Sequence, residues 1–320
     1  MTYPRGHIPD HDAVVDARTG FHLHPEYGAI RSQPTLPLFT SNRALLPRDK
    51  GGPGLRNQFD ASGCEGCANS SGGTVQLALD GTRLAEPISH IGTYYGGLMC
   101  DAPPPNPDGT LPPLLDVGTM PSSILSGWQL FGGSAESAWG QLPMSSRTMY
   151  IDPSGQNPAV PQGALIQPTP NQLYAGRSCR LNGAYFLTSG GVALVRDVMR
   201  CLSAKKVLTN AIPASGDAFQ GYMGGVLGAL DGPIDHAQLA IDYTWTGTQA
   251  QLDAFLAGDD SLVTLVILHG VNSWGGAGCP DGGTWGELDS INNLGGQYRA
   301  DANFIKQAAD WAVLDLTRVS

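Results

Sequence analysis

The stretch NQFDASGCEGCANSS, residues 57–71, carries the residues on which the prediction of the fold depends. Small residues surround Cys67, and a run of valine and leucine up to residue 84 follows at spacings that fit a buried helix. A thiol becomes a strong nucleophile only as the thiolate, and the N-terminus of a helix stabilises that charge. The stretch therefore predicts a nucleophilic Cys67 where a loop enters a helix. Gln58 and the backbone N–H of Cys67 are the expected donors to an oxyanion.

Composition and charge exclude several classes of protein. The chain has 320 residues, of which 41% are hydrophobic and 14% charged, and it holds 43 glycines and 24 prolines, a mixture typical of a loop-rich globular protein. Its formal net charge of −10 argues against binding to nucleic acid or to an anionic membrane. No apolar stretch approaches the roughly 20 residues that span a bilayer, and residues 1–12 lack the apolar core of a signal peptide. We expect synthesis in the cytoplasm, with incorporation into a virion or non-classical export left open.

The pattern of apolar residues predicts an α+β protein. Residues 1–56, rich in proline and glycine, are expected to form an extended arm, and the proline-rich segment 152–172 is expected to connect two lobes. Helices are expected over 67–84, 86–100, 121–131, 191–204 and 244–258, and strands over 181–187, 205–214, 236–243 and 261–271. Residues 301–316 are expected to form a C-terminal helix capped by Asp301, which docks on the core or contacts an assembly partner.

Two segments far from Cys67 supply the partners that a nucleophilic thiol needs. His236 opens the alternating strand IDHAQLAIDY (234–243), a rigid place from which to present an imidazole. Asn272, in LHGVNSWGG (268–276), can accept a hydrogen bond from the second ring nitrogen of that histidine, and Trp274 can exclude water from the bond. A second Trp-Gly pair follows in TWGE (284–287). Together these segments predict a Cys–His–Asn arrangement.

In this order the motifs resemble the papain (C1) family of cysteine peptidases over roughly residues 55–290. The family pattern NQG…CGSCW resembles NQ…CEGCA here, VDHAVxxVGY resembles IDHAQLAIDY, and NSWGxxWGE resembles VNSWGG followed by TWGE. The resemblance implies a two-lobe fold, with a helical lobe, an antiparallel barrel-like lobe and a cleft between them. It also implies that Cys67 is the nucleophile, His236 the base, Asn272 the residue that orients it, and Gln58 the oxyanion-hole glutamine. Cys64 matches an upstream cysteine that is often disulfide-bonded, and Cys100 is the partner we would test first.

The chain departs from this pattern in ways that suggest a divergent microbial or viral type. Gln58 lies nine residues before Cys67, a longer gap than the family has, so the insertion must bulge outward. Ala68 replaces the usual tryptophan. Glu65 replaces a small residue, and its carboxylate would oppose thiolate formation if it pointed toward Cys67.

Other uses of the same residues are less well supported. Cys64 and Cys67 form a CxxC, but the chain has neither the thioredoxin-like setting of a redox pair nor the second CxxC of a zinc site. His269 is a rival base, but it is expected on a neighbouring strand. We therefore expect no metal and no organic cofactor.

The resulting prediction is one catalytic domain, with an arm over 1–56, a helical lobe over 57–165 carrying the nucleophile, and a sheet-rich lobe over 166–320 carrying His236 and Asn272. The expected activity is that of a cysteine endopeptidase, with a protein or peptide as substrate and a thioester intermediate. Two alternatives remain open. One is a weakly active or inactive papain-fold module used for binding or structure, for example in a virion. The other is a cysteine amidase or acyltransferase acting on cell-wall peptides or isopeptides.

Overall fold

The computed structural model describes residues 25–45, 58, 62–103, 105–110, 112–139, 164–165, 177–274, 285–286 and 296–319. The predictions for residues 1–24 and 46–56 of the arm, for Asn57, for most of the insertion that follows Gln58 and for most of the connecting segment 152–172 lie outside the described residues.

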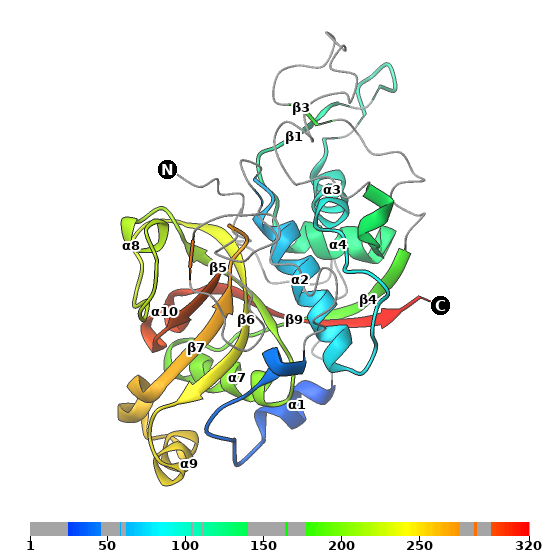
Figure 1. Cartoon of the computed structure of the whole chain (residues 1–320). Helices are drawn as coiled ribbons and strands as arrows, with labels where there is room; N and C mark the ends of the chain where they lie inside the picture. Colours follow the sequence, from blue (N-terminus) through cyan, green and yellow to red (C-terminus); the bar gives the residue numbers. More distant parts are fainter. Residues whose placement is uncertain are drawn as a thin grey trace.

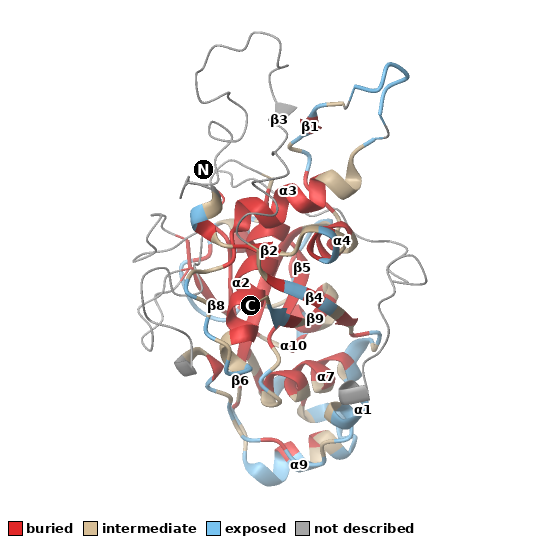
Figure 2. Ribbon diagram, turned by 90° about the vertical axis from the view of Figure 1, so that its right-hand side faces the viewer, coloured by how far each residue is buried: buried red, intermediate tan, exposed pale blue. Residues whose placement is uncertain are grey.

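Three helices form the first layer: α2 (Cys64–Leu79), α3 (His90–Asp101) and α4 (Pro121–Phe131). In Figure 1 these helices lie together, with α3 and α4 above and α2 running down alongside the sheet, and α2 and α3 are largely buried in Figure 2. Glycines let these helices approach closely, because a Cβ at Gly127 would lie 2.5 Å from the carbonyl carbon of Gly96. On α2, a Cβ at Gly66 would lie 2.6 Å from the Cβ of Tyr94. The packing of the helical region therefore depends on positions without side chains.

The second layer is a seven-stranded sheet with the strand order β2-β4-β9-β5-β6-β7-β8, in which every neighbouring pair is antiparallel. The strands are β2 (Gly133–Ser134), β4 (Arg177–Phe186), β5 (Leu208–Pro213), β6 (Ile234–Trp245), β7 (Val266–Val271), β8 (Gln297–Ala300) and β9 (Ala309–Arg318). Helix α2 lies against the middle of the sheet, where Gly72 contacts Leu239 of β6 and Thr209 of β5. The predicted α+β class, with a helical region and an antiparallel sheet, is confirmed.

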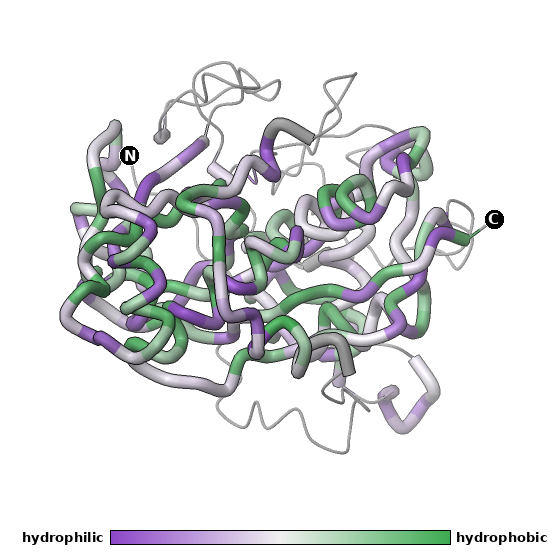
Figure 3. Tube along the Cα trace, turned by 90° about the horizontal axis from the view of Figure 1, so that it is seen from below, coloured by the Kyte–Doolittle hydropathy of each residue, from purple (hydrophilic) through white to green (hydrophobic). Residues whose placement is uncertain are grey.

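Shorter elements surround these layers: α1 (Pro25–Arg31), η1 (Asn42–Leu45), η2 (Glu136–Trp139), α7 (Gly191–Ser203), α8 (Asp217–Gln220), α9 (Gln249–Ala257), η3 (Asp260–Leu265), α10 (Ala302–Gln307) and the pair β1 (Leu114–Leu115) with β3 (Ala164–Leu165). The largest apolar cluster joins α7, α9 and α10 to β5–β8. Figure 3 shows apolar and polar positions interleaved along most elements, as expected when each element buries one face. In the described part of the chain, no helix has both the length and the apolarity that a bilayer crossing requires.

The C-terminal helix is only partly present, so this prediction is wrong beyond residue 307. Asp301 does cap α10, where its carboxylate accepts hydrogen bonds from the backbone N–H groups of Asn303 and Phe304. After α10 the chain becomes β9, a central strand that pairs with both β4 and β5. Trp311 and Ala312, which lie in the segment predicted to be a helix, are instead buried residues of that strand.

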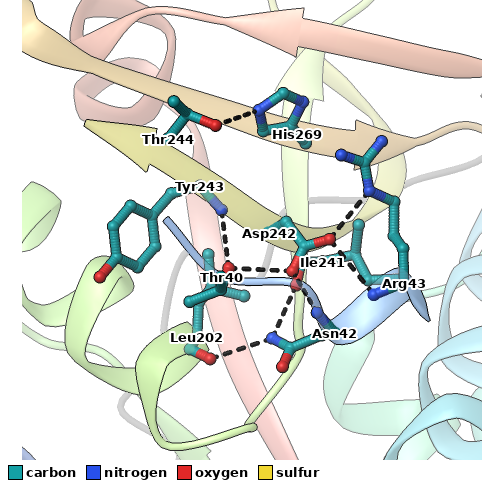
Figure 4. Close-up of polar contacts among 9 residues, drawn as sticks. All are labelled: Thr40, Asn42, Arg43, Leu202, Ile241, Asp242, Tyr243, Thr244 and His269. Carbon is teal, nitrogen blue, oxygen red and sulfur yellow. Dashed lines mark hydrogen bonds and ion pairs between the residues drawn. The ribbon is translucent and has the colours of Figure 1, made fainter. Parts of the chain in front are cut away.

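Residues 40–43, which precede the helical region, are hydrogen-bonded to β6, as Figure 4 shows. The carboxylate of Asp242, which is 1% exposed, accepts hydrogen bonds from the Thr40 hydroxyl at 2.9 Å, from the Asn42 backbone N–H at 2.6 Å and from the Arg43 Nε at 2.8 Å. The expected arm thus contains two short helical elements, α1 and η1, in its described part. Within this described part, Leu38 and Thr40 are hydrogen-bonded to β6, and α1 lies against α7.

Candidate active site

Cys67 lies one turn inside α2, because this helix begins at Cys64 rather than at Cys67. The backbone N–H of Cys67 donates to the carbonyl of Gly63 at 3.0 Å, which is a hydrogen bond of the first helical turn. The expectation that this N–H serves an oxyanion is therefore wrong in this structure. The thiol still lies close to the N-terminal end of the helix, where the helix dipole favours negative charge.

Glu65 and Ala68, the two residues near Cys67 that depart from the family pattern, have different surroundings in the structure. Glu65 and Cys67 are two positions apart on α2, so their side chains leave nearly opposite sides of the helix. The Glu65 carboxylate accepts a hydrogen bond from the Asn69 side chain at 2.8 Å, and Glu65 is 3% exposed. Its carboxylate is thus directed along the helix toward Asn69. Ala68 packs with Cys64 and with Ala237 of β6 and also lines the pocket beside Cys67.

His236 and Asn272 are joined by a hydrogen bond. The Nε2 atom of His236 lies 2.5 Å from the Oδ1 atom of Asn272, and both residues are almost completely buried. The backbone N–H of Ser273 donates to the same Oδ1 at 2.7 Å. Because that N–H can only donate, the atom facing it must be the amide oxygen, and His236 Nε2 must then carry a proton. This arrangement leaves Nδ1 as the ring nitrogen that can exchange a proton with another group.

Aromatic rings cover this pair. The Trp274 ring lies 4.5 Å from the His236 ring between centroids, with an angle of 36° between the planes. Phe219 contacts both Trp274 and Trp285, and the Trp285 indole N–H donates to the Phe219 carbonyl at 2.7 Å. The second Trp-Gly motif thus supports the ring that lies against the histidine. The His236–Asn272 bond is shielded from water, which strengthens its electrostatic part.

Gln58 lies beside Asn272, although nine residues separate it from Cys67. Its backbone N–H donates to the Ser273 carbonyl at 2.7 Å, and its side-chain oxygen accepts a hydrogen bond from the Ser273 hydroxyl. Gln58 is 0% exposed. Since Ser273 holds the amide oxygen, the NH2 group of Gln58 is the end that can donate elsewhere. Ser273 had no assigned role in the sequence, although it stands inside the NSWG motif.

A small pocket brings the two halves of the site together. Its walls are formed by Cys67, Ala68, Ser71, Gln238, Leu239, Val271, Asn272 and Ser273. The helix that carries Cys67 therefore meets Asn272 and Ser273 after β7 and Gln238 and Leu239 of β6; His236, on the same strand β6, is not among the residues that line the pocket. Cys67 is only 2% exposed, so the site is nearly closed. Gln238, two residues after His236 on β6, is a polar residue of the site that had no assigned role in the sequence.

The other candidate residues lie elsewhere or have other partners. The ring of His269, on β7, faces the Thr244 hydroxyl with His269 Nε2 at 3.0 Å, as Figure 4 shows, and not the pocket. No group of three histidine, cysteine, aspartate or glutamate side chains among the described residues is arranged to hold a metal.

The suggested Cys64–Cys100 disulfide is wrong in this structure. Cys100 is a free thiol near the end of α3, whereas Cys64 begins α2 and packs against Ala68 and Ala237. Burial raises the pKa of the Cys100 thiol to about 11, and the neighbouring Asp101 contributes in the same direction. Burial also raises the pKa values of Cys179 and Cys201, each to about 12. These three thiols are therefore protonated, and poor nucleophiles, at neutral pH.

Solved structures of cysteine proteases are similar to this fold. Xylellain, a cysteine protease from Xylella fastidiosa, matches with a TM-score of 0.58 and 17% identity over 98% of this chain and 97% of its own. Bromelain from Ananas comosus, in complex with the E64 inhibitor, matches with a TM-score of 0.52 and 16% identity over 89% and 99%. The cysteine protease and lectin-like domains of Cwp84 from Clostridium difficile match with a TM-score of 0.57 and 11% identity over 99% and 57%. No family model and no curated protein sequence matches the chain. At these identities the likeness is one of fold.

Proposed function

Because the chain has the papain-like cysteine protease fold, we propose that it is a cysteine peptidase with Cys67 as nucleophile, His236 as base and Asn272 as the residue that orients the histidine. The observation that supports this most strongly is the 2.5 Å contact between His236 Nε2 and Asn272 Oδ1, shielded by Trp274. Asn272 lines the same pocket as Cys67. The substrate is a protein or peptide.

The chemistry follows from the proton positions. His236 Nδ1 takes the proton of Cys67, and the resulting thiolate attacks the carbonyl carbon of the scissile peptide bond. Asn272 stabilises the imidazolium through its amide oxygen. His236 then gives the proton to the leaving amine, which departs and leaves a thioester on Cys67. Water attacks this thioester with His236 as base, so the acid is released and the thiol restored.

Gln58 is the proposed donor to the oxyanion. The hydrogen bond from the Ser273 hydroxyl to the Gln58 side-chain oxygen fixes the orientation of the Gln58 amide. Its NH2 group is therefore already oriented to donate to the oxyanion. The Cys67 backbone N–H has no part in this proposal, since it is bonded to Gly63.

One observation favours a second candidate, a papain-fold module that binds but does not cleave. Cys67, His236, Asn272 and Gln58 are all at most 2% exposed. A substrate carbonyl must reach the thiol, so a peptidase needs this site to open, whereas a binding module does not.

Hydrolysis of peptides separates these functions. We expect the reduced protein to cleave an unfolded protein such as casein, and the Cys67→Ser variant to lose activity about a thousandfold or more, because an alcohol is a far weaker nucleophile than a thiolate. Cys100→Ser is the matched control, and its activity should stay within twofold. Equal activity of wild-type and Cys67→Ser protein would overturn the proposal. Cleavage restricted to isopeptide or cell-wall peptide substrates would instead support the alternative of a cysteine amidase or acyltransferase.

A further inference from the structure

A row of buried amide side chains continues inward from the His236–Asn272 pair. Asn210 lies opposite Gln238 in the β5–β6 ladder. The β6–β7 ladder pairs Leu239 with Val271, so continuing its register by one residue places Gln238 opposite Asn272. Figure 1 shows these three strands side by side in the sheet. The three side chains therefore stand in one row across the sheet, on the face that also carries His236.

The hydrogen bonds of this row are incomplete at two places: at the outer end, where Asn210 Nδ2 has no partner among the described residues, and between Gln238 and Asn272. The Gln238 side-chain N–H donates to Asn210 Oδ1 at 3.3 Å, which leaves Gln238 Oε1 as an acceptor. Within the described part of the chain, neither Gln238 Oε1 nor Asn272 Nδ2 has a hydrogen-bond partner, although both atoms are buried. One atom is an acceptor and the other a donor. Leaving both unpaired inside the protein would be costly, because a buried polar group has lost its bonds to water.

We propose that Gln238 is a positioning residue of the active site: through one bridging water, its side-chain oxygen is linked to the Asn272 amide nitrogen and so holds the Asn272 oxygen toward His236. The pocket that both residues line has room for about one water molecule, and neither atom has a direct hydrogen-bond partner among the described residues, so the link passes through that water. The role assigned to Gln238 rests on the proposed peptidase function.

The consequence is a chain of aligned hydrogen bonds. His236 Nε2–H donates to Asn272 Oδ1, Asn272 Nδ2–H donates to the bridging water, that water donates to Gln238 Oε1, and Gln238 Nε2–H donates to Asn210 Oδ1. Aligned bonds of this kind polarise one another. The Asn272 oxygen thereby becomes a better acceptor, which favours the imidazolium needed in the first step. Valine stands at the position of Gln238 in the family pattern quoted above, so this chain carries a polar residue where that pattern is apolar.

The test replaces Gln238 by a side chain of similar shape that cannot accept this bond. We expect Gln238→Met to lower kcat about five- to tenfold, with KM within twofold, because losing one hydrogen bond weakens the orientation of the base and not substrate binding. Gln238→Val should do the same and guards against a failure of the methionine variant to fold. Gln76→Met is the matched control: Gln76 is equally buried on α2 but bonds to Asp80 and to the Val207 N–H, so its loss should lower stability and leave kcat unchanged.

A second measurement does not depend on activity. In protein labelled with ¹⁵N-histidine, the Nε2 resonance of His236, assigned by its absence in His236→Ala, should shift in Gln238→Met and not in Gln76→Met. An unchanged kcat together with an unchanged Nε2 resonance in both Gln238 variants would overturn the proposal. If the wild-type protein has no Cys67-dependent activity but the resonance shifts, the peptidase function fails while the Asn272–Gln238 link stands.

Discussion

At the scale of single residues, the thiols of this chain differ in their surroundings more than in their chemistry. All three thiols are buried in apolar clusters, with Cys67 2% exposed and Cys179 and Cys201 0% exposed, but Cys67 also sits one turn into a helix and lines the pocket with Asn272. Burial disfavours the thiolate and raises the pKa values of Cys179 and Cys201, each to about 12. A reactive cysteine should therefore be distinguishable from the others without any substrate.

Alkylation at different pH values tests this contrast. Because the pKa of Cys100 is raised to about 11, its thiolate fraction increases about tenfold for each pH unit up to that value. We expect iodoacetamide to modify Cys100 slowly at pH 7 and about a hundredfold faster at pH 9, measured residue by residue with mass spectrometry. In denaturant, where the burial is lost, Cys100 should already react readily at pH 8.5. Rapid modification of Cys100 at pH 7 in the folded protein would contradict the raised pKa.

At the scale of elements, the helical region depends on close contacts between backbones. The helices α3 and α4 cross at Gly96 and Gly127, and α2 packs against α3 at Gly66. Gly73 of α2 lies against the Trp128 ring, where a Cβ would be 2.5 Å from the ring. At Gly66, Gly73 and Gly127 there is no space for an added methyl group, whereas at Gly96 a Cβ would be in ordinary contact, 3.6 Å from its nearest neighbour.

Adding that methyl group should separate two helices. We expect Gly127→Ala to lower the free energy of unfolding by about 1–3 kcal/mol, since overpacking outweighs the better helix propensity of alanine. Gly28→Ala is the control: no atom lies within 4 Å of the added carbon in α1, so this variant should be unchanged or more stable by up to about 1 kcal/mol. Denaturant unfolding measures both. Equal stability of the two variants would argue against the close helix crossing.

Much of the element pattern was predictable, and the errors have physical causes. Helix α4 was predicted with its bounds, because Pro121 and Gly132 mark its ends. The start of α2 was placed late, since Gly66 looked like a loop residue although its contact with Tyr94 is what requires glycine. Residues 308–316 have apolar spacing that fits a helix, but pairing with two neighbouring strands decided their conformation. Non-local pairing of this kind cannot be read from local periodicity.

The candidate site was predictable as far as its motifs reach. His236 and Asn272 were predicted to interact, and the structure places them 2.5 Å apart. The row through Gln238 depends on which residues face each other across the sheet, and the bond from Ser273 to Gln58 joins two residues outside the strands that are 215 positions apart. Strand register fixes the contacts of the row, and one sequence does not determine register.

At the scale of the whole molecule, the segment before the helical region is tied to the sheet by buried carboxylates. Asp242 binds Thr40, Asn42 and Arg43, and Asp197 of α7, 2% exposed, lies 3.3 Å from Arg31 of α1. These contacts join residues that are about 200 positions apart for Asp242 and about 165 for Asp197. The described part of the N-terminal segment is therefore expected to contribute to the stability of the whole fold.

Removing the charge of Asp242 should show this contribution. Asp242→Asn leaves the Arg43 side chain, which is 15% exposed, without its carboxylate, and we expect a loss of about 3 kcal/mol in the free energy of unfolding. Asp260→Asn removes an ion pair to Arg196 in which the carboxylate is 63% exposed, and should cost about 1 kcal/mol or less. Thermal unfolding compares the two. A loss for Asp242→Asn no greater than that for Asp260→Asn would mean that the segment does not stabilise the fold.

The central claim is that Cys67 is a nucleophile activated by the His236–Asn272 pair. Covalent labelling of the reduced, folded protein with an epoxide thiol inhibitor such as E64, with the adduct located by mass spectrometry, tests it most directly. We predict one adduct on Cys67 at neutral pH, strongly diminished in His236→Ala and reduced in Asn272→Ala. The absence of an adduct on Cys67, or labelling that is equally fast without His236, would contradict the claim.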